Sequence, residues 1–110
     1  MSYIQVLYHF IFRTKYNIPA ISERYENDLY AYIAGFIKNK KSKLHCINGM
    51  PEHLHIFTDL HPSLSISGFV RDLKISTSKW LYQNQAKFPL FRGWGTGYAV
   101  FAYNKKDAQM

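Results

Sequence analysis

The sequence of 110 residues contains one cysteine, few acidic residues and no long apolar run. Because Cys46 is alone, an internal disulfide is excluded, and a reducing cytoplasm is the expected setting. No apolar segment approaches the ~18–20 residues that a membrane-spanning helix needs, and no signal peptide is visible. We therefore expect a cytoplasmic protein without a membrane partner. The neighbours of Cys46 in segment 44–47 predict a buried strand residue rather than a reactive thiol.

Acidic residues are outnumbered two to one, with 7 Asp and Glu against 14 Lys and Arg, which gives a formal net charge of +7. Such an excess on a small domain favours an anionic partner such as nucleic acid. Aromatic residues make up 17% of the chain, and aromatic rings combined with cations suit single strands. The alternative is that the rings form the core and the charge only maintains solubility. Charge alone does not decide between them.

The pattern of apolar residues predicts alternating strands and helices. Segment 3–14 alternates and is apolar on most of both faces, so it should be a central strand. A helix follows, for which Ser22 is the expected N-cap, and it ends in the lysine-rich segment 38–41. Segments 43–50 and 53–60 form an antiparallel hairpin around a tight turn. A second helix begins at Ser63 or Ser65, and segment 98–103 is the fourth strand.

This order predicts an α+β fold of the ferredoxin-like βαββαβ type. Its four-stranded antiparallel sheet carries two helices on one face and leaves the other face available for a site or a partner. We expect a single domain over residues 1–110.

The segment Pro51-Glu52-His53-Leu54-His55-Ile56-Phe57 carries the main functional signal. Alternate residues of a strand point to the same face, so His53 and His55 should lie side by side, roughly 7 Å apart along the chain. Two imidazoles on rigid backbone can provide part of a metal site. The simpler interpretation is two polar residues on the wet face of a half-buried strand. His9 could neighbour this site from the first strand, or could be a packed strand histidine.

Two groups of residues are candidates for DNA contact. Arg13 and Lys15 lie at the end of the first strand. On the second helix, Ser67, Arg71, Lys74 and Ser78 form a separate polar and basic stripe. Cations and hydroxyls both donate to phosphate oxygens, although a solvated helix face has the same pattern. The expected DNA-binding residues are Arg13, Lys15, Arg71, Lys74 and Ser78.

Four stretches of the chain resemble the single-tyrosine transposases of the IS200/IS605 type, members of the HUH endonuclease superfamily. They are Phe12-Arg13-Thr14-Lys15-Tyr16, the block 50–57, the Val70–Lys74 segment with Ser76–Trp80, and Gly97-Tyr98-Ala99-Val100-Phe101. The resemblance covers nearly the whole chain in the order typical of that family. The His-hydrophobic-His strand after a Met-Pro turn is its most specific part.

The resemblance implies that His53 and His55 bind a divalent metal ion, Mg²⁺ or Mn²⁺. It also implies metal-assisted cleavage and rejoining of single-stranded DNA with hairpin ends, through a 5′-phosphotyrosine link. Phenol is a poor nucleophile at neutral pH, so a nearby cation would favour the phenolate and offset charge on the phosphate. Members of the family are homodimers in which two sheets join, so a homodimer is expected here.

The end of the chain departs from the family pattern. The family's tyrosine lies on a helix after the last strand, whereas here Asn104 and Asp107 resemble a capping box and the sequence ends at Met110. We therefore expect a copy truncated after the fourth strand, without its own nucleophile, so that catalytic residues stay unknown. Tyr98 and Tyr103 lie on the fourth strand and are interpreted as packing or base-stacking residues.

Two other functions remain open from the sequence. One is a non-catalytic domain on the same fold that binds single-stranded nucleic acid, with RNA as a possible ligand. The other is an unrelated metal-dependent phosphoesterase, although the acidic ligands that such sites use are not evident near the two histidines.

Overall fold

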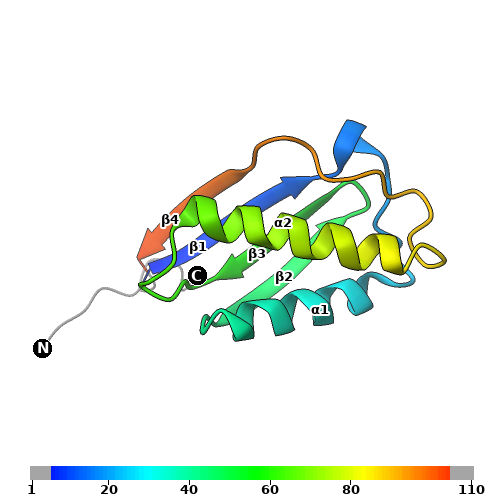
Figure 1. Ribbon diagram of the computed structural model, residues 1–110. Helices are drawn as coiled ribbons and strands as arrows, with labels where there is room; N and C mark the ends of the chain where they lie inside the picture. The colour runs from blue at the N-terminus through cyan, green and yellow to red at the C-terminus, as the bar shows by residue number, and fades with distance from the viewer. Residues whose placement is uncertain (1–5, 105–110) are drawn as a thin grey trace, which may run out of the picture.

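A computed structural model describes residues 6–104 and has the predicted βαββαβ order (Figure 1). A single 3₁₀ turn is added after the first strand. The elements are β1 (Val6–Arg13), η1 (Lys15–Asn17), α1 (Glu26–Asn39), β2 (Leu44–Met50), β3 (His53–Thr58), α2 (Ile66–Gln83) and β4 (Ala99–Asn104).

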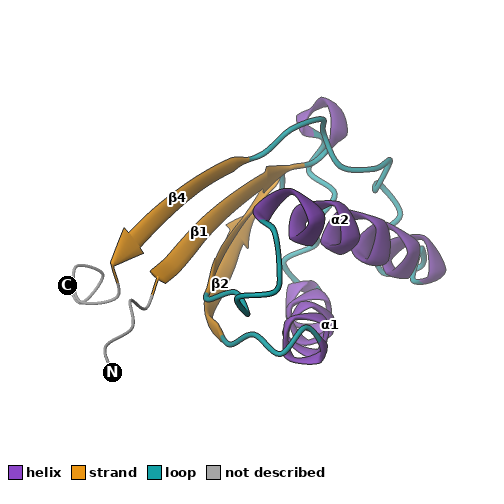
Figure 2. Cartoon of the chain, turned by 60° about the vertical axis from the view of Figure 1, so that its left-hand side comes forward, coloured by secondary structure: helices purple, strands orange, loops and turns teal. Residues whose placement is uncertain are grey.

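The strands form one four-stranded sheet in the order β2-β3-β1-β4. Every neighbouring pair is antiparallel, and β1 lies between β3 and β4, so its predicted central place is confirmed. Figure 2 shows α1 and α2 on the same side of the sheet. The predicted α+β architecture is therefore confirmed, and we call the side without helices the open face.

The core lies between the sheet and the two helices. Phe10, Leu54 and Ile56 are fully buried on the helix side of the sheet, and burying each such side chain stabilises the fold by roughly 1.5–3 kcal/mol. The helices contribute buried Leu29, Ile33, Ile37, Phe69 and Leu73. Because strand residues alternate, burial of Leu54 and Ile56 directs His53 and His55 to the open face.

The helix starts were predicted with mixed success. Ser65 is the N-cap of α2, and its side chain accepts a hydrogen bond from the Gly68 N–H at 3.0 Å. Ser22, by contrast, is not the cap of α1, because a turn in which its carbonyl accepts from the Tyr25 N–H at 3.1 Å precedes the helix. The chain before this turn is fixed by buried Ile21, whose N–H donates to the Pro51 carbonyl, so the helix begins only at Glu26.

The expectation that Cys46 is buried is wrong. Its side chain is exposed because β2 is an edge strand and pairs Cys46 with Phe57 on the open face, which no helix covers. A register shift between Leu44 and Cys46 produces this placement.

The expected helix start after Asn104 lies outside the described residues. Among residues 6–104, neither helix combines the length and the apolar composition needed to cross a bilayer.

Gly49 allows β2 to approach β3 closely beside the two histidines. A Cβ at this position would lie 2.5 Å from the His53 carbonyl oxygen and 2.9 Å from Leu54 Cδ2. Backbone cannot yield as a flexible side chain would, so only glycine fits here without a shift of the hairpin.

We expect Gly49→Ala to lower the free energy of unfolding by about 1–3 kcal/mol, because the added methyl overpacks the hairpin. Gly35→Ala is the matched control, since a Cβ there meets nothing within 4 Å in the middle of α1. That substitution should stabilise the protein by about 0.5–1 kcal/mol through helix propensity. Urea unfolding measures both, and equal stability of the Gly49→Ala variant and the unsubstituted protein would contradict the close approach.

Candidate functional site

The two histidines of β3 lie side by side on the open face, as predicted. Their ring centroids are 4.9 Å apart with an interplanar angle of 70°. Leu54 and Ile56 are buried on the opposite side of the strand, which fixes the direction of both imidazoles. The pair is therefore oriented by core packing rather than by surface contacts alone.

His9 joins this pair from β1. Its Nε2 lies 2.8 Å from Nδ1 of His55, and its ring stacks on Phe57 with centroids 4.1 Å apart. Burial lowers the pKa of both His9 and His55, and the positive charge of a neighbouring imidazole lowers each further. Both rings are thus favoured in the neutral form, in which one nitrogen can donate and the other can accept a hydrogen bond or bind a metal.

His53 has a carboxylate beside it. Its Nδ1 lies 3.2 Å from Oε1 of Glu52 and is buried, yet the two atoms do not form an aligned hydrogen bond. The contact is therefore close in distance and unfavourable in angle. In many metal sites, a carboxylate beside the histidine nitrogen that does not bind the metal orients the ring.

The strand-connecting turn that carries Glu52 is held by Thr14. The N–H of buried Thr14 donates to the Glu52 carbonyl oxygen at 2.9 Å, and its hydroxyl is shared between the carbonyls of Ile18 at 2.7 Å and Glu52 at 3.2 Å. The N–H of Ile21 donates to Pro51 in the same turn at 3.0 Å. Glu52 and His53 are thus tied to the end of β1.

The two histidines can supply two of the ligands of a divalent ion. With Nδ1 of His55 paired to His9 and Nδ1 of His53 buried beside Glu52, the Nε2 atoms are left as the available donors. Within residues 6–104, no group of three or more His, Cys, Asp or Glu side chains is placed to hold a metal. The remaining positions around an ion would have to come from water or a phosphate. Imidazole nitrogens favour Mn²⁺ over the harder Mg²⁺, which prefers oxygen.

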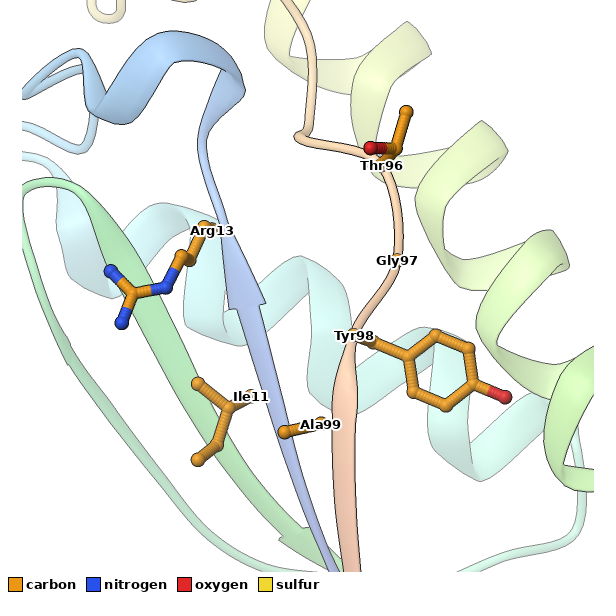
Figure 3. Close-up of a pocket in the computed structure, with 6 residues that line it drawn as sticks. All are labelled: Ile11, Arg13, Thr96, Gly97, Tyr98 and Ala99. Carbon is orange, nitrogen blue, oxygen red and sulfur yellow. The ribbon is translucent and has the colours of Figure 1, made fainter.

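Arg13 lies next to the histidines in the sheet. In the antiparallel register Arg13 is opposite His53 and Ile11 is opposite His55. Figure 3 shows Arg13 and Ile11 extending to one side of β1, whereas Tyr98 extends to the other side, on which α2 lies. Arg13 and Lys15 are both exposed and line a shallow pocket that Tyr16 also lines.

The other three predicted DNA-binding residues lie on α2, on the helix side of the sheet. Arg71 is exposed and pairs with Asp72 at 3.3 Å, and no hydrogen bond of the Ser78 side chain is found in the described part of the chain. Lys74 donates to the carbonyls of Gly95 at 3.0 Å and Gly97 at 2.6 Å, and burial lowers the pKa of its ammonium. Lys74 therefore has a structural role in holding the loop before β4.

His61 is separate from the site. Strand β3 ends at Thr58, and His61 Nδ1 lies 2.7 Å from the Ser63 hydroxyl and accepts from the Ser63 N–H. Tyr16, which sequence reasoning did not single out, is the most exposed of the large apolar residues that the structure describes, at 78%. The signals available were its place in the Phe12–Tyr16 stretch that carries the family resemblance and its position next to Lys15.

Comparisons with known proteins agree on one family. A family model described as "Transposase IS200 like" matches residues 2–110. A search of curated proteins found no match.

Two solved structures share the fold. A candidate transposase from Deinococcus radiodurans is 22% identical with a TM-score of 0.81, over 97% of this chain and 85% of that one. A REP-associated tyrosine transposase bound to a REP hairpin is 16% identical with a TM-score of 0.61, over 97% of this chain. The match spans 63% of that second protein, so a third of its length has no counterpart here.

Proposed function

The chain belongs to the IS200-like transposase family, and we propose that it binds hairpin-ended single-stranded DNA through a divalent metal at His53 and His55. The observation that supports this most is the imidazole pair itself, neighbouring on the open face, with Nδ1 of His55 paired to His9 and Nδ1 of His53 lying 3.2 Å from a Glu52 carboxylate oxygen. We propose that the protein acts in the cytoplasm.

Each residue of the site would have a separate role. Nε2 of His53 and Nε2 of His55 would hold Mn²⁺ or Mg²⁺, and a bound divalent ion supplies charge that polarises a phosphate oxygen. His9 would fix the ring of His55, and Glu52 would fix that of His53. Arg13, opposite His53, would offset the negative charge of the DNA strand whose phosphate lies at the metal.

DNA contact would come mainly from Arg13, which lies opposite His53 in the sheet, and from Lys15, which lines the same pocket as Arg13. Arg71 and Ser78 would contact a second part of the DNA that passes over α2, where the ammonium of Lys74 is held by the carbonyls of Gly95 and Gly97. The REP-associated relative was solved with a DNA hairpin, which supports a hairpin as the ligand of this chain.

A homodimer through joined sheets is part of the proposal. Strand β4 is an edge of the described sheet, with only β1 pairing to it, and its side chains include exposed Phe101 and Tyr103. An exposed edge can accept a strand from a second copy of the chain.

Cleavage through a 5′-phosphotyrosine needs a nucleophile that these 110 residues do not supply in the place typical of the family. The segment 104–110 contains no tyrosine, and Tyr98 extends away from Arg13 and Ile11 (Figure 3). We therefore propose that the 110-residue chain binds DNA without cutting it. A non-catalytic nucleic-acid-binding domain would also bind DNA without cleaving it. Its binding would not require metal.

Metal dependence separates these two functions. We expect His53→Ala and His55→Ala each to weaken Mn²⁺ binding at least tenfold by calorimetry, and to weaken hairpin DNA binding in Mn²⁺. His61→Ala is the matched control, because its ring contacts Ser63 away from the site. DNA binding that survives both chelation and the double substitution would favour the non-catalytic module instead.

His9 provides a test of how the site is oriented. His9→Phe removes the contact with His55 Nδ1 but keeps an aromatic ring to stack on Phe57. Loss of such an outer partner should weaken Mn²⁺ binding about tenfold, while the free energy of unfolding changes by less than about 0.5 kcal/mol. An unchanged Mn²⁺ affinity would show that His9 is only a packing residue.

Cleavage is tested directly with labelled hairpin-ended single-stranded DNA and Mn²⁺. We expect a complex in a native gel and no covalent product in a denaturing gel, because no tyrosine is in place to attack the phosphate. A covalent protein–DNA band would show that the 110-residue chain carries its own nucleophile.

A further inference from the structure

Tyr16 combines high exposure with an unfavourable backbone conformation. Its φ and ψ are 60° and 18°, in the left-handed region, and Asn17 follows with φ 55°. A residue with a Cβ is disfavoured there, and an aromatic ring that is 78% exposed gains little from packing. Nothing in the core explains why this position carries a tyrosine rather than glycine.

The surrounding hydrogen bonds hold the turn in this conformation. The Asn17 N–H donates to the Thr14 carbonyl at 3.1 Å, and the Lys15 N–H donates to the Gly93 carbonyl at 2.8 Å. On the other side, the Gly95 N–H donates to the Arg13 carbonyl at 2.7 Å. The η1 turn and the loop before β4 are therefore fastened to one another. Backbone strain that the structure fixes in this way is concentrated at binding sites.

A pocket of about 360 Å³ lies between these two fastened segments. The segment 13–17 forms one wall, and Trp94, Gly95 and Thr96 form the other. A second pocket, of about 280 Å³, shares Arg13 and Thr96 with the first and extends along β1 to Ile11 (Figure 3). The two pockets adjoin at Arg13 and Thr96, and the sheet register pairs Ile11 with His55 and Arg13 with His53.

The charge along the two pockets is positive. Arg13 and Lys15 line them, and none of the described residues that line them is acidic. The Lys15 ammonium lies 5.3 Å from the centroid of the Tyr16 ring. An exposed ring beside cations is the combination with which proteins hold single-stranded nucleic acid, because bases stack on the ring and phosphates pair with the cations.

We propose that Tyr16 is a stacking platform for one unpaired base of the DNA strand whose phosphate lies at His53 and His55. This proposal rests on the proposed function and adds to it a subsite for a flanking nucleotide. Tyr16 is three residues beyond Arg13, at most about 11 Å along the chain, so a short stretch of DNA spans both. Arg13 and Lys15 contact its phosphates, and the base enters the pocket beside Trp94.

The test uses hairpin DNA with a single-stranded flank, in which one flank position at a time is made abasic. Affinity is measured by fluorescence anisotropy in Mn²⁺. Base stacking predicts that one abasic position weakens binding to the unsubstituted protein about tenfold. Tyr16→Gly should weaken binding to intact DNA by about the same factor and be insensitive to that abasic position. Tyr16→Phe keeps the ring and should keep the abasic penalty.

Tyr16→Gly also separates binding from folding. Glycine adopts positive φ freely, so the thermal midpoint of this variant should not fall. Ile75→Ala, at an exposed position on α2 that lines neither pocket, is the control that should bind as the unsubstituted protein does.

Three results would overturn the proposal, and they differ in what else they affect. Full affinity and an unchanged abasic profile for Tyr16→Gly would overturn the stacking subsite and leave the proposed function intact. A change in oligomeric state for Tyr16→Gly, with no change in the abasic profile, would make Tyr16 an interface residue instead. Absence of DNA binding by the unsubstituted protein would overturn the proposed function together with the subsite.

Discussion

The antiparallel pairing of β1 with β3 is the constraint on which the rest of the site depends. Its register places His9 beside Phe57, Ile11 opposite His55 and Arg13 opposite His53. Burial of Leu54 and Ile56 fixes which face of β3 the histidines occupy, and a slip by one residue would exchange the faces. At the end of this pairing, Thr14 donates hydrogen bonds to the carbonyl of Glu52. The fold core and the two candidate metal ligands are therefore positioned by the same two strands.

The two faces of the sheet have different roles. The helix side is filled with apolar side chains, and Lys74 on α2 uses its ammonium to hold the loop before β4. The open face carries the imidazoles of His9, His53 and His55, an exposed arginine and exposed aromatic residues. The positive charge of the chain is thus divided between cations that maintain structure, such as Lys40 paired with Asp72, and cations such as Arg13 that have no described acidic partner. Only the second kind can meet phosphate without disturbing the fold.

Local pattern was sufficient for much of the fold. Alternation gave β1 and the β2–β3 hairpin, and Ser65 capped α2 as expected, because these features depend on neighbours within a few residues. Ser22 and Cys46 were predicted wrongly for reasons that are not local. The start of α1 depends on where buried Ile21 docks against Pro51, and the exposure of Cys46 depends on β2 being an uncovered edge strand.

The sequence by itself determined the order of elements, the shared face of His53 and His55, and the resemblance that the family match confirms. These follow from the period of two along a strand and from short motifs, which need no knowledge of distant contacts. Only the tertiary structure decided that His9 binds to His55 across 46 residues, that Thr14 donates to the Glu52 carbonyl, and that Tyr16 stands exposed above a basic pocket. The physical reason is that strand register and loop docking join segments far apart in the chain, and no local pattern encodes which side chains they bring together.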